Sequence, residues 1–164
     1  MQPMEWTEQA GEMLAQLTRG AFLTTAWEGR VNTMTIGWGQ LGFIWSRPIF
    51  TVLVRPTRFS FGLLEQSREF TVSLPDGDME EELAVCGSTS GRDGDKFAAA
   101  GLTAMPSQVI ATPVVGGCAL YYECRVLYQH TLAPLALDPS VASMYTSNDH
   151  HTVYHGEIVA AYHR

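Results

Sequence analysis

The sequence of 164 residues predicts a mainly β fold of the α+β class, an antiparallel barrel with short covering helices. About six runs of strand length are rich in β-branched and aromatic residues, and helical segments are inserted among them without the βαβ alternation of a parallel sheet. The chain is long enough to bury one core and too short for two independent cores. We therefore expect a single domain over residues 1–164.

The beginning of the chain predicts a helix followed by a β-hairpin. Apolar residues in the range 3–17 recur close to helical spacing, which indicates a short amphipathic helix. Residues 21–26 and 31–36 have strand character, and the connection 27–30 contains a glycine. Two strands joined by a connection of this length are typical of a hairpin.

The next segments predict two strands and a short helix. Residues 43–45 and 49–54 are apolar, and Pro48 marks the gap between them. The second run is almost wholly apolar and rich in β-branched residues, as in a strand that is buried on both faces. Thr57 is expected to cap a helix over 58–66, because its hydroxyl oxygen can accept a hydrogen bond from the first free N–H groups.

The rest of the chain is predicted to combine strands with short helices. We expect a strand over 69–74, a turn over 75–78, a helix over 79–85, a loop over 90–94, a helix over 95–100 closed by Gly101, and long strands over 119–128 and 153–162. Together with the earlier strands, these two long strands are sufficient to form an antiparallel barrel.

Composition and charge limit the kinds of ligand that the protein can bind. The formal net charge is −7 and the pI is about 5.1, so we expect no nucleic-acid partner, which would need a broad basic surface. Of the 10 basic residues, Arg55, Arg58, Arg92 and Lys96 fall inside two short segments. Clustered cations in an acidic chain predict a local anion site. The alternative is that Arg55 and Arg58 pair with surface carboxylates, as most arginines do.

Cysteine spacing and hydropathy predict a soluble, cytoplasmic protein. Cys86, Cys118 and Cys124 form no C-x-x-C pair and leave an odd count, which argues against a disulfide scaffold and a structural zinc site. The first residues lack a basic and apolar leader, and no later window holds the roughly 18 uninterrupted apolar residues of a membrane span. We expect a reducing compartment and no membrane association.

The histidines near the end of the chain are not expected to bind a metal. His151 and His155 stand four residues apart, and the β-branched residues around them favour a strand. Four strand residues span roughly 13 Å, which is too far for one ion. Structural or surface histidines are the better interpretation.

Three segments carry the chemistry of a flavin-phosphate site. Residues 32–38 supply polar donors, residues 54–60 supply paired arginines after the buried strand, and residues 86–97 add hydroxyls, glycines, an arginine and a lysine. Hydroxyls and backbone N–H groups can bond to the edge of a planar heteroaromatic ring, and arginine side chains hold a phosphate bidentately. We interpret the three segments together as one site.

These segments, in this order, resemble the flavin reductase-like family, in particular its flavoredoxin-like members. The motifs are Gly20-Ala21-Phe22-Leu23-Thr24-Thr25, Asn32-x-Met34-Thr35-x-Gly37-Trp38, Val54-Arg55-Pro56-Thr57-Arg58, Glu69-Phe70-Thr71-Val72-Ser73, Cys86-Gly87-x-x-Ser90-Gly91-Arg92-Asp93-x-Asp95-Lys96-Phe97 and Glu123-Cys124. The resemblance covers nearly the whole chain. It implies an FMN-binding split β-barrel, usually a homodimer with the flavin near the subunit interface.

The resemblance also implies roles for particular residues. The backbone of residues 33–37 would lie along the isoalloxazine or the ribityl chain, although Thr33 and Thr35 could also be ordinary strand threonines. Arg55, Arg58 and Ser60 would contact the flavin phosphate, and Asp93 would orient Arg92. The implied cofactor-binding residues are Thr33, Met34, Thr35, Ile36, Gly37 and Trp38; Arg55, Thr57, Arg58 and Ser60 toward the phosphate; Ser90, Gly91, Arg92, Asp93 and Lys96 as a second wall; and His151 and Tyr154.

No catalytic set of side chains accompanies this site, which is expected when a cofactor carries the reaction. No resident Rossmann site is predicted, so NAD(P)H would be a transient reductant that binds over the flavin. We expect an FMN-dependent oxidoreductase that takes a hydride from NAD(P)H and passes electrons to flavin, a redox protein or a small molecule. The alternatives are a flavoredoxin-type electron carrier without NAD(P)H oxidation, and an interaction protein that has lost its cofactor, against which the basic residues argue.

Overall fold

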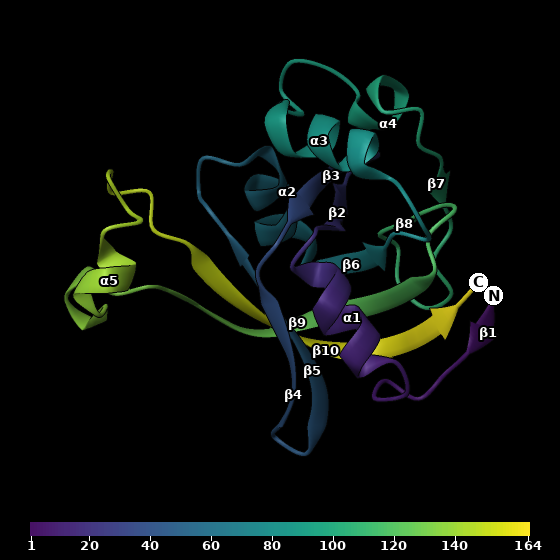
Figure 1. The fold of residues 1–164 in the computed structure, drawn as a ribbon, viewed down its shortest axis with the longest axis horizontal. Coiled ribbons are helices and arrows are strands. Elements are labelled where there is room, and N and C mark those ends of the chain that lie inside the picture. Colours follow the sequence, from purple (N-terminus) through teal and green to yellow (C-terminus); the bar gives the residue numbers. More distant parts are fainter.

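One open antiparallel sheet with short covering helices forms the fold, seen here in a computed structural model that describes residues 1–164 (Figure 1). Its strands follow the order β3-β2-β6-β9-β10-β5-β4, and β1 pairs with β10. Every pairing in the sheet is antiparallel. The sheet does not close, because β3 and β4 are its two edges. This agrees with the predicted split barrel.

The predicted elements are present in type and order, with shifts at their bounds, and the short elements β1, β7, β8, η1 and α5 were not predicted. The strands are β1 (Gln2–Pro3), β2 (Ala21–Trp27), β3 (Arg30–Ile36), β4 (Gly39–Ile44), β5 (Arg47–Val54), β6 (Glu69–Leu74), β7 (Ala104–Met105), β8 (Val114–Val115), β9 (Leu120–Thr131) and β10 (Thr152–His163). The helices are α1 (Ala10–Leu17), α2 (Phe59–Ser67), α3 (Glu80–Ser88), α4 (Lys96–Ala99), the short 3-10 helix η1 (Pro134–Ala136) and α5 (Pro139–Ala142).

Two hydrophobic clusters lie on opposite faces of the central strands. Phe22 belongs to the cluster under α3 and α4, whereas its neighbour Leu23 belongs to the larger cluster that α1 and α2 cover. Neighbouring side chains of a strand point to opposite faces, so β2 is buried on both. In β5, Phe50 and Val52 pack into the larger cluster while Thr51 between them is also buried, which confirms the prediction for this strand.

The β4–β5 hairpin differs from the predicted pair of strands. β4 begins earlier, at Gly39, and the turn lies at Trp45 and Ser46, both with positive φ (55° and 57°). Pro48 lies inside β5, opposite Phe43 of β4, and pairing of β5 with β10 begins only at the next residue. A proline is tolerated there because its missing N–H faces no second partner strand.

Two further expectations about local structure were wrong. The first helix begins at Ala10 and not at residue 3, and the residues before it form β1 and turns. Arg58, not Thr57, is the N-cap of α2, and it makes no side-chain cap. The Thr57 hydroxyl instead donates to Asp149 Oδ2 at 2.6 Å, a short hydrogen bond of the kind that an ionised acceptor forms.

Two segments extend away from the body of the molecule: the β4–β5 hairpin, and the connection from β9 to β10 that carries α5 (Figure 1). Both join strands that flank the functional residues described below. None of the helices has the length and apolar character needed to cross a membrane.

Candidate functional site

Two adjoining cavities lie where β3 and the end of β5 meet α2, α3 and the loop before α4. The tryptophan cavity, of about 190 Å³, is lined by Met34, Thr35, Ile36, Gly37, Trp38, Leu53, Arg55, Arg58 and His151. The lysine cavity, of about 100 Å³, is lined by Asn32, Met34, Thr57, Arg58, Phe59, Ser60, Ser88, Thr89, Ser90, Gly91 and Lys96. Because Met34 and Arg58 line both, the two cavities adjoin at these side chains.

A nearly buried cation defines the lysine cavity. Lys96 is 6% exposed, and its Nζ donates to the Cys86 carbonyl at 2.7 Å. No carboxylate forms an ion pair with Lys96 or with neighbouring Arg58. Burial lowers the pKa of Lys96, and the positive charge of Arg58 lowers it further. An unpaired buried charge is costly, so this cavity is built to receive an anion.

Buried polar side chains hold the wall opposite Lys96. Asn32 Nδ2 donates to Ser60 Oγ at 2.8 Å, and both residues are almost fully buried. Gly91 approaches this pair so closely that a Cβ there would collide with Asn32 Oδ1 and would lie 2.5 Å from Phe59 Cδ1. The loop can therefore close over the cavity only with glycine at position 91.

Hydroxyls and a helix terminus complete the lysine cavity. Ser88 is the last residue of α3, Thr89 and Ser90 follow it, and all three line the lysine cavity. The nine-residue helix α2 begins at Phe59 beside them. The first N–H groups of a helix carry partial positive charge and attract anions. Cations, hydroxyls and free N–H groups in one small cavity are the chemistry of a phosphate site.

The tryptophan cavity is more open and contains aromatic groups. Trp38 is 44% exposed, and its ring centroid lies 5.1 Å from that of His151. His151 Nδ1 forms a hydrogen bond with the Tyr145 hydroxyl at 2.7 Å. Burial lowers the pKa of His151 to about 4, and Arg55 contributes to this shift. The imidazole is therefore neutral at pH 7 and offers a planar surface rather than a charge.

Asp149 positions Arg55 beside the tryptophan cavity. Arg55 Nη1 lies 3.9 Å from Asp149 Oδ2, and its guanidinium lies 5.0 Å from the centroid of the Tyr145 ring. The same carboxylate accepts bonds from the Thr57 hydroxyl and N–H. Asp149 thus ties the β9–β10 connection to the loop after β5. In this position Arg55 lines the tryptophan cavity and not the lysine cavity.

Most of the residues implied by the resemblance come together here, and four do not line either cavity. Thr33 is fully buried and bonds to Thr24 and the Leu23 carbonyl. Asp93 is exposed and forms no ion pair with Arg92. Arg92 is positioned instead by its bond from Nη1 to the Thr57 carbonyl at 2.9 Å.

Tyr154 is the fourth residue that lies elsewhere. Its side chain is fully buried in the larger hydrophobic cluster, and its hydroxyl donates to Glu65 Oε1 at 2.7 Å. Burial, the hydrogen bond and the charge of Glu65 all raise the pKa of Tyr154. We therefore leave Tyr154 out of the site that we propose below.

Several lining residues were not among those implied by the sequence. Asn32 stood within a motif, but its buried bond to Ser60 joins elements far apart in the chain. Ser88 and Thr89 belong to a visible run of hydroxyl residues that ends at Ser90 and could have been included. Asp149 lines neither cavity, and its role in holding Thr57 and Arg55 could not be predicted from its own segment, because Thr57 lies 92 positions earlier in the chain.

Two other patterns of the sequence, the neighbouring histidines and a glycine motif, do not add a second ligand site. No group of three or more His, Cys, Asp or Glu residues is placed to hold a metal ion. His155 lies in β10, whereas His151 directly precedes this strand. Gly37, Gly39 and Gly42 match the G-x-G-x-x-G spacing. They lead into and along the edge strand β4 and not into a helix, so they lack the context that a dinucleotide-binding turn requires.

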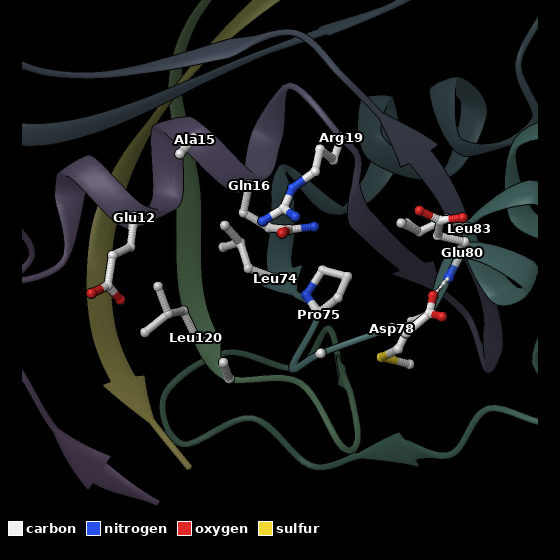
Figure 2. Close-up of a pocket in the computed structure, with 13 residues that line it drawn as sticks. Glu12, Ala15, Gln16, Arg19, Leu74, Pro75, Asp78, Glu80, Leu83 and Leu120 are labelled. Atoms are coloured by element: carbon white, nitrogen blue, oxygen red, sulfur yellow. Dashed lines mark hydrogen bonds between the residues drawn. The ribbon is translucent and has the colours of Figure 1, made fainter.

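A larger cavity, of about 520 Å³, lies between α1, the loop after β6 and the start of α3 (Figure 2). Glu12, Asp78 and Glu80 face it together with Arg19 and apolar side chains. None of the residues implied by the resemblance lines this cavity. Its three carboxylates and one arginine do not favour an anionic cofactor. The two smaller adjoining cavities are therefore the better candidate for the functional site.

Comparison with known proteins finds similarity in sequence and in fold. The family model "Flavin reductase like domain" matches residues 14–164. An FMN-binding protein from Thermus thermophilus is 27% identical, with a TM-score of 0.70 over 88% of this chain and 69% of that one. Flavoredoxin from Methanosarcina acetivorans is 24% identical, with a TM-score of 0.69 over 88% of this chain and 68% of that one; this likeness shows the fold.

A protein from Archaeoglobus fulgidus is 26% identical over 106 residues. The match covers 62% of this chain and 59% of that protein, which is less than two thirds of its length.

Proposed function

This chain belongs to the flavin reductase-like family, and from that premise we propose that it binds FMN in the joined tryptophan and lysine cavities and acts as an oxidoreductase. The observation that carries the proposal is Lys96, a buried and unpaired cation in a cavity rich in hydroxyls. A phosphate monoester would supply the missing negative charge.

The lysine cavity would hold the phosphate end of the cofactor. The Lys96 ammonium donates one of its three protons to Cys86 and retains two for phosphate oxygens. Arg58 stands between the two cavities and would orient the phosphate relative to the ring. Ser60 and Ser90 would add hydroxyl donors, and Asn32 would position Ser60.

The tryptophan cavity would hold the ring system. Backbone groups of residues 34–37 lie along its wall and would bond to the heteroaromatic edge, while Trp38 and neutral His151 offer planar surfaces. When bound, the flavin would supply a two-electron acceptor for hydride, which the side chains of this chain do not provide. Because Trp38 is exposed, the cavity would leave one face of the flavin ring accessible to NAD(P)H as a transient reductant.

A visible absorbance spectrum of the purified protein, desalted after addition of FMN, tests the proposal. We expect retained flavin that bleaches under anaerobic NADH or NADPH. The Lys96→Met variant should lose the retained flavin, whereas Arg125→Met, which removes an exposed arginine on β9, should keep it. No FMN binding by the wild-type protein in an equilibrium titration would overturn the proposal.

The second candidate is an electron carrier of the flavoredoxin type. It is favoured by the open tryptophan cavity, which a redox protein could approach as readily as a nicotinamide. In this case the protein would retain FMN, but the flavin would stay oxidised with either nucleotide. The anaerobic step of the same experiment therefore separates the two functions.

We further propose that the protein is a homodimer. Phe43 is 65% exposed and Trp45 is 55% exposed on the projecting β4–β5 hairpin, and exposed Tyr128 lies against Trp45. Exposed apolar groups that gather in one region mark a protein interface. Light scattering at micromolar concentration should give twice the mass of the 18.1 kDa chain. A monomer would contradict this expectation.

A reducing, cytoplasmic location also remains a proposal. It is supported by three buried cysteines that are all free thiols. Burial raises the pKa of Cys118 to about 12, so this thiol stays protonated and unreactive at pH 7.

A further inference from the structure

Two histidines of the long strands β9 and β10 come together outside the proposed flavin site. His155 stands four residues from His151 in the chain, but the pairing of β10 with β9 brings it beside His130. The centroids of the His130 and His155 rings are 5.7 Å apart, and the ring planes differ by 19°. Neither residue lines the tryptophan cavity or the lysine cavity. The two imidazoles therefore form a separate pair of metal-ligating side chains.

An irregularity in the pairing of β9 with β10 lies next to this pair. Tyr128 of β9 is opposite His155, and the register then shifts so that Leu127 has no partner on β10. A bulge of this kind increases the local twist and redirects the side chains beside it. Because alternate residues of a strand share a face, Tyr128 and His130 lie on the face of the sheet that His155 occupies. The fold thus gathers three rings that are far apart in the sequence.

The hydrogen bonds around the pair leave ring nitrogens free to bind an ion. Thr51, buried on β5, shares a hydrogen bond of 3.0 Å between its Oγ1 and His155 Nδ1. When Nδ1 donates this bond, the lone pair of the imidazole lies on Nε2. Histidines that ligate metals almost always donate their other ring N–H in this way, which fixes the orientation of the ring. The ring of His130 takes part in none of the hydrogen bonds that histidines form in this structure.

An indole lies beside the two imidazoles. The ring centroid of Trp45 is 6.2 Å from that of His155 and 6.2 Å from that of Tyr128, edge-on in both cases. Trp45 has a φ of 55°, a conformation that bulky residues rarely adopt. Such a backbone persists only where the surrounding structure holds it, so the turn of the β4–β5 hairpin keeps this indole close to the histidines.

We infer that His130 and His155 form a binding site for a divalent late transition metal, with one ion held by two imidazole nitrogens and water in its remaining positions. Imidazole ligands suit Zn²⁺, Ni²⁺ and Cu²⁺, of which Cu²⁺ binds most tightly. Glu157, two residues after His155, is engaged by Arg47 at 2.7 Å, so the pair has no free carboxylate from this residue for Mg²⁺ or Ca²⁺.

The state of the site at pH 7 favours binding. Burial lowers the pKa of His155, and His130 lowers it further, so no proton has to leave this ring before an ion binds. The net charge of −7 attracts cations to the protein. An ion held by one residue of β9 and one of β10 would join the two strands and stabilise the folded chain.

Titration of the purified protein with Cu²⁺ at pH 7 tests the inference, with Trp45 as the reporter because bound Cu²⁺ quenches a nearby indole. We expect saturable quenching at one ion per chain and a higher thermal midpoint, and neither with Mg²⁺. His130→Asn and His155→Asn should each lose the quenching at equimolar Cu²⁺, since one imidazole cannot chelate. Thr51→Val should weaken Cu²⁺ about tenfold, the lower end for removal of a supporting hydrogen bond.

Two further variants locate the ion. Trp45→Phe should remove most of the quenching while calorimetry still detects binding. His150→Gln is the matched control, because His150 and its neighbour His151 offer Cu²⁺ another pair of imidazoles, and it should behave as wild type. Circular dichroism without metal checks that each variant is folded.

The inference would be overturned by the absence of saturable quenching in the wild type, by quenching that persists in folded His130→Asn, or by its loss in His150→Gln. One ion per two chains would also overturn it, because the ion would then be shared between copies. None of the substituted residues lines the proposed flavin site, so either result leaves the proposed function as it stands.

Discussion

The lysine cavity and the tryptophan cavity adjoin one another but are built differently. In the lysine cavity, Lys96, Asn32 and Ser60 are nearly buried and are fixed by short hydrogen bonds. In the tryptophan cavity, Trp38 is exposed and Arg55 is held by a longer contact to Asp149. One end of the site is rigid before any ligand arrives, and the other end is open to solvent.

This difference matches what each end would have to do in a flavoprotein. A phosphate does not change during the reaction, so a preorganised cavity reduces the entropic cost of holding it. The ring must exchange electrons with a second molecule, so its surroundings have to leave room for that molecule. Variants at the two ends should therefore have different consequences for binding and for stability.

The largest effect is expected where the rigid end is packed most tightly. Gly91→Ala would place a Cβ against Asn32 and Phe59, whereas Gly94→Ala in the same loop would meet nothing within 4 Å. We expect Gly91→Ala to weaken FMN binding by up to about 3 kcal/mol, because the cavity keeps its shape only if the cost of overpacking against Asn32 and Phe59, about 1–3 kcal/mol, is met. A fluorescence titration would measure this, with Gly94→Ala as the matched control. Wild-type affinity in the Gly91→Ala variant would show that the lysine cavity does not hold the cofactor.

A second prediction separates the roles of the two arginines. Arg58 lines both cavities and should contact phosphate, so Arg58→Ala should weaken FMN by about 1.5–3 kcal/mol, the range for hydrogen bonds to charged groups. Riboflavin, which lacks the phosphate, should bind this variant as it binds the wild type. Arg55→Ala, at the open end, should weaken both ligands by about 1 kcal/mol.

Isothermal titration of FMN and riboflavin against both arginine variants provides the measurement. The assignment of Arg58 to phosphate would be wrong if Arg58→Ala weakened riboflavin as much as FMN. An effect of Arg55→Ala on FMN alone would instead place the phosphate at Arg55.

The sequence predicted best those features that depend on neighbouring residues. The strand over 69–74 has the predicted bounds, and the hairpin over 21–36 forms as expected, because alternation and turn chemistry are local signals. The segments that line the site were also visible as motifs. What local pattern alone did not reveal was how these segments are tied together, since Asn32 meets Ser60 across 28 positions.

Tyr154 shows a second limit of prediction from sequence motifs, and the alternation of side chains along a strand already argues against its assignment to the site. The family resemblance implied that Tyr154 and His151 both contact the cofactor. Odd and even positions of a strand face opposite sides, so residues 151 and 154 are not expected to share a surface if the strand extends over both. The structure places Tyr154 in the core with its hydroxyl on Glu65, whereas His151 precedes β10 and faces Trp38.

The smallest expected effect concerns the pH dependence at the open end. Desolvation and Arg55 lower the pKa of His151 to about 4, against the opposing effect of Asp149, and Arg58 adds to the lowering. In the unfolded chain the pKa of a histidine is about 6.5. As the pH falls below about 6.5, the unfolded chain takes up a proton that the folded protein refuses, so the free energy of unfolding decreases until the pH nears the folded pKa.

His151→Gln removes this contribution. Between pH 6.5 and pH 5, the stability of the wild-type protein should fall by about 1 kcal/mol more than that of the variant, a value that allows for partial exposure of the site. Urea unfolding of flavin-free protein at a series of pH values gives the comparison, with His163→Gln as a control on the far end of β10. Parallel pH profiles for the wild type and His151→Gln would mean that the histidine is solvated, and that the open end is even less preorganised than its contacts with Trp38 and Tyr145 indicate.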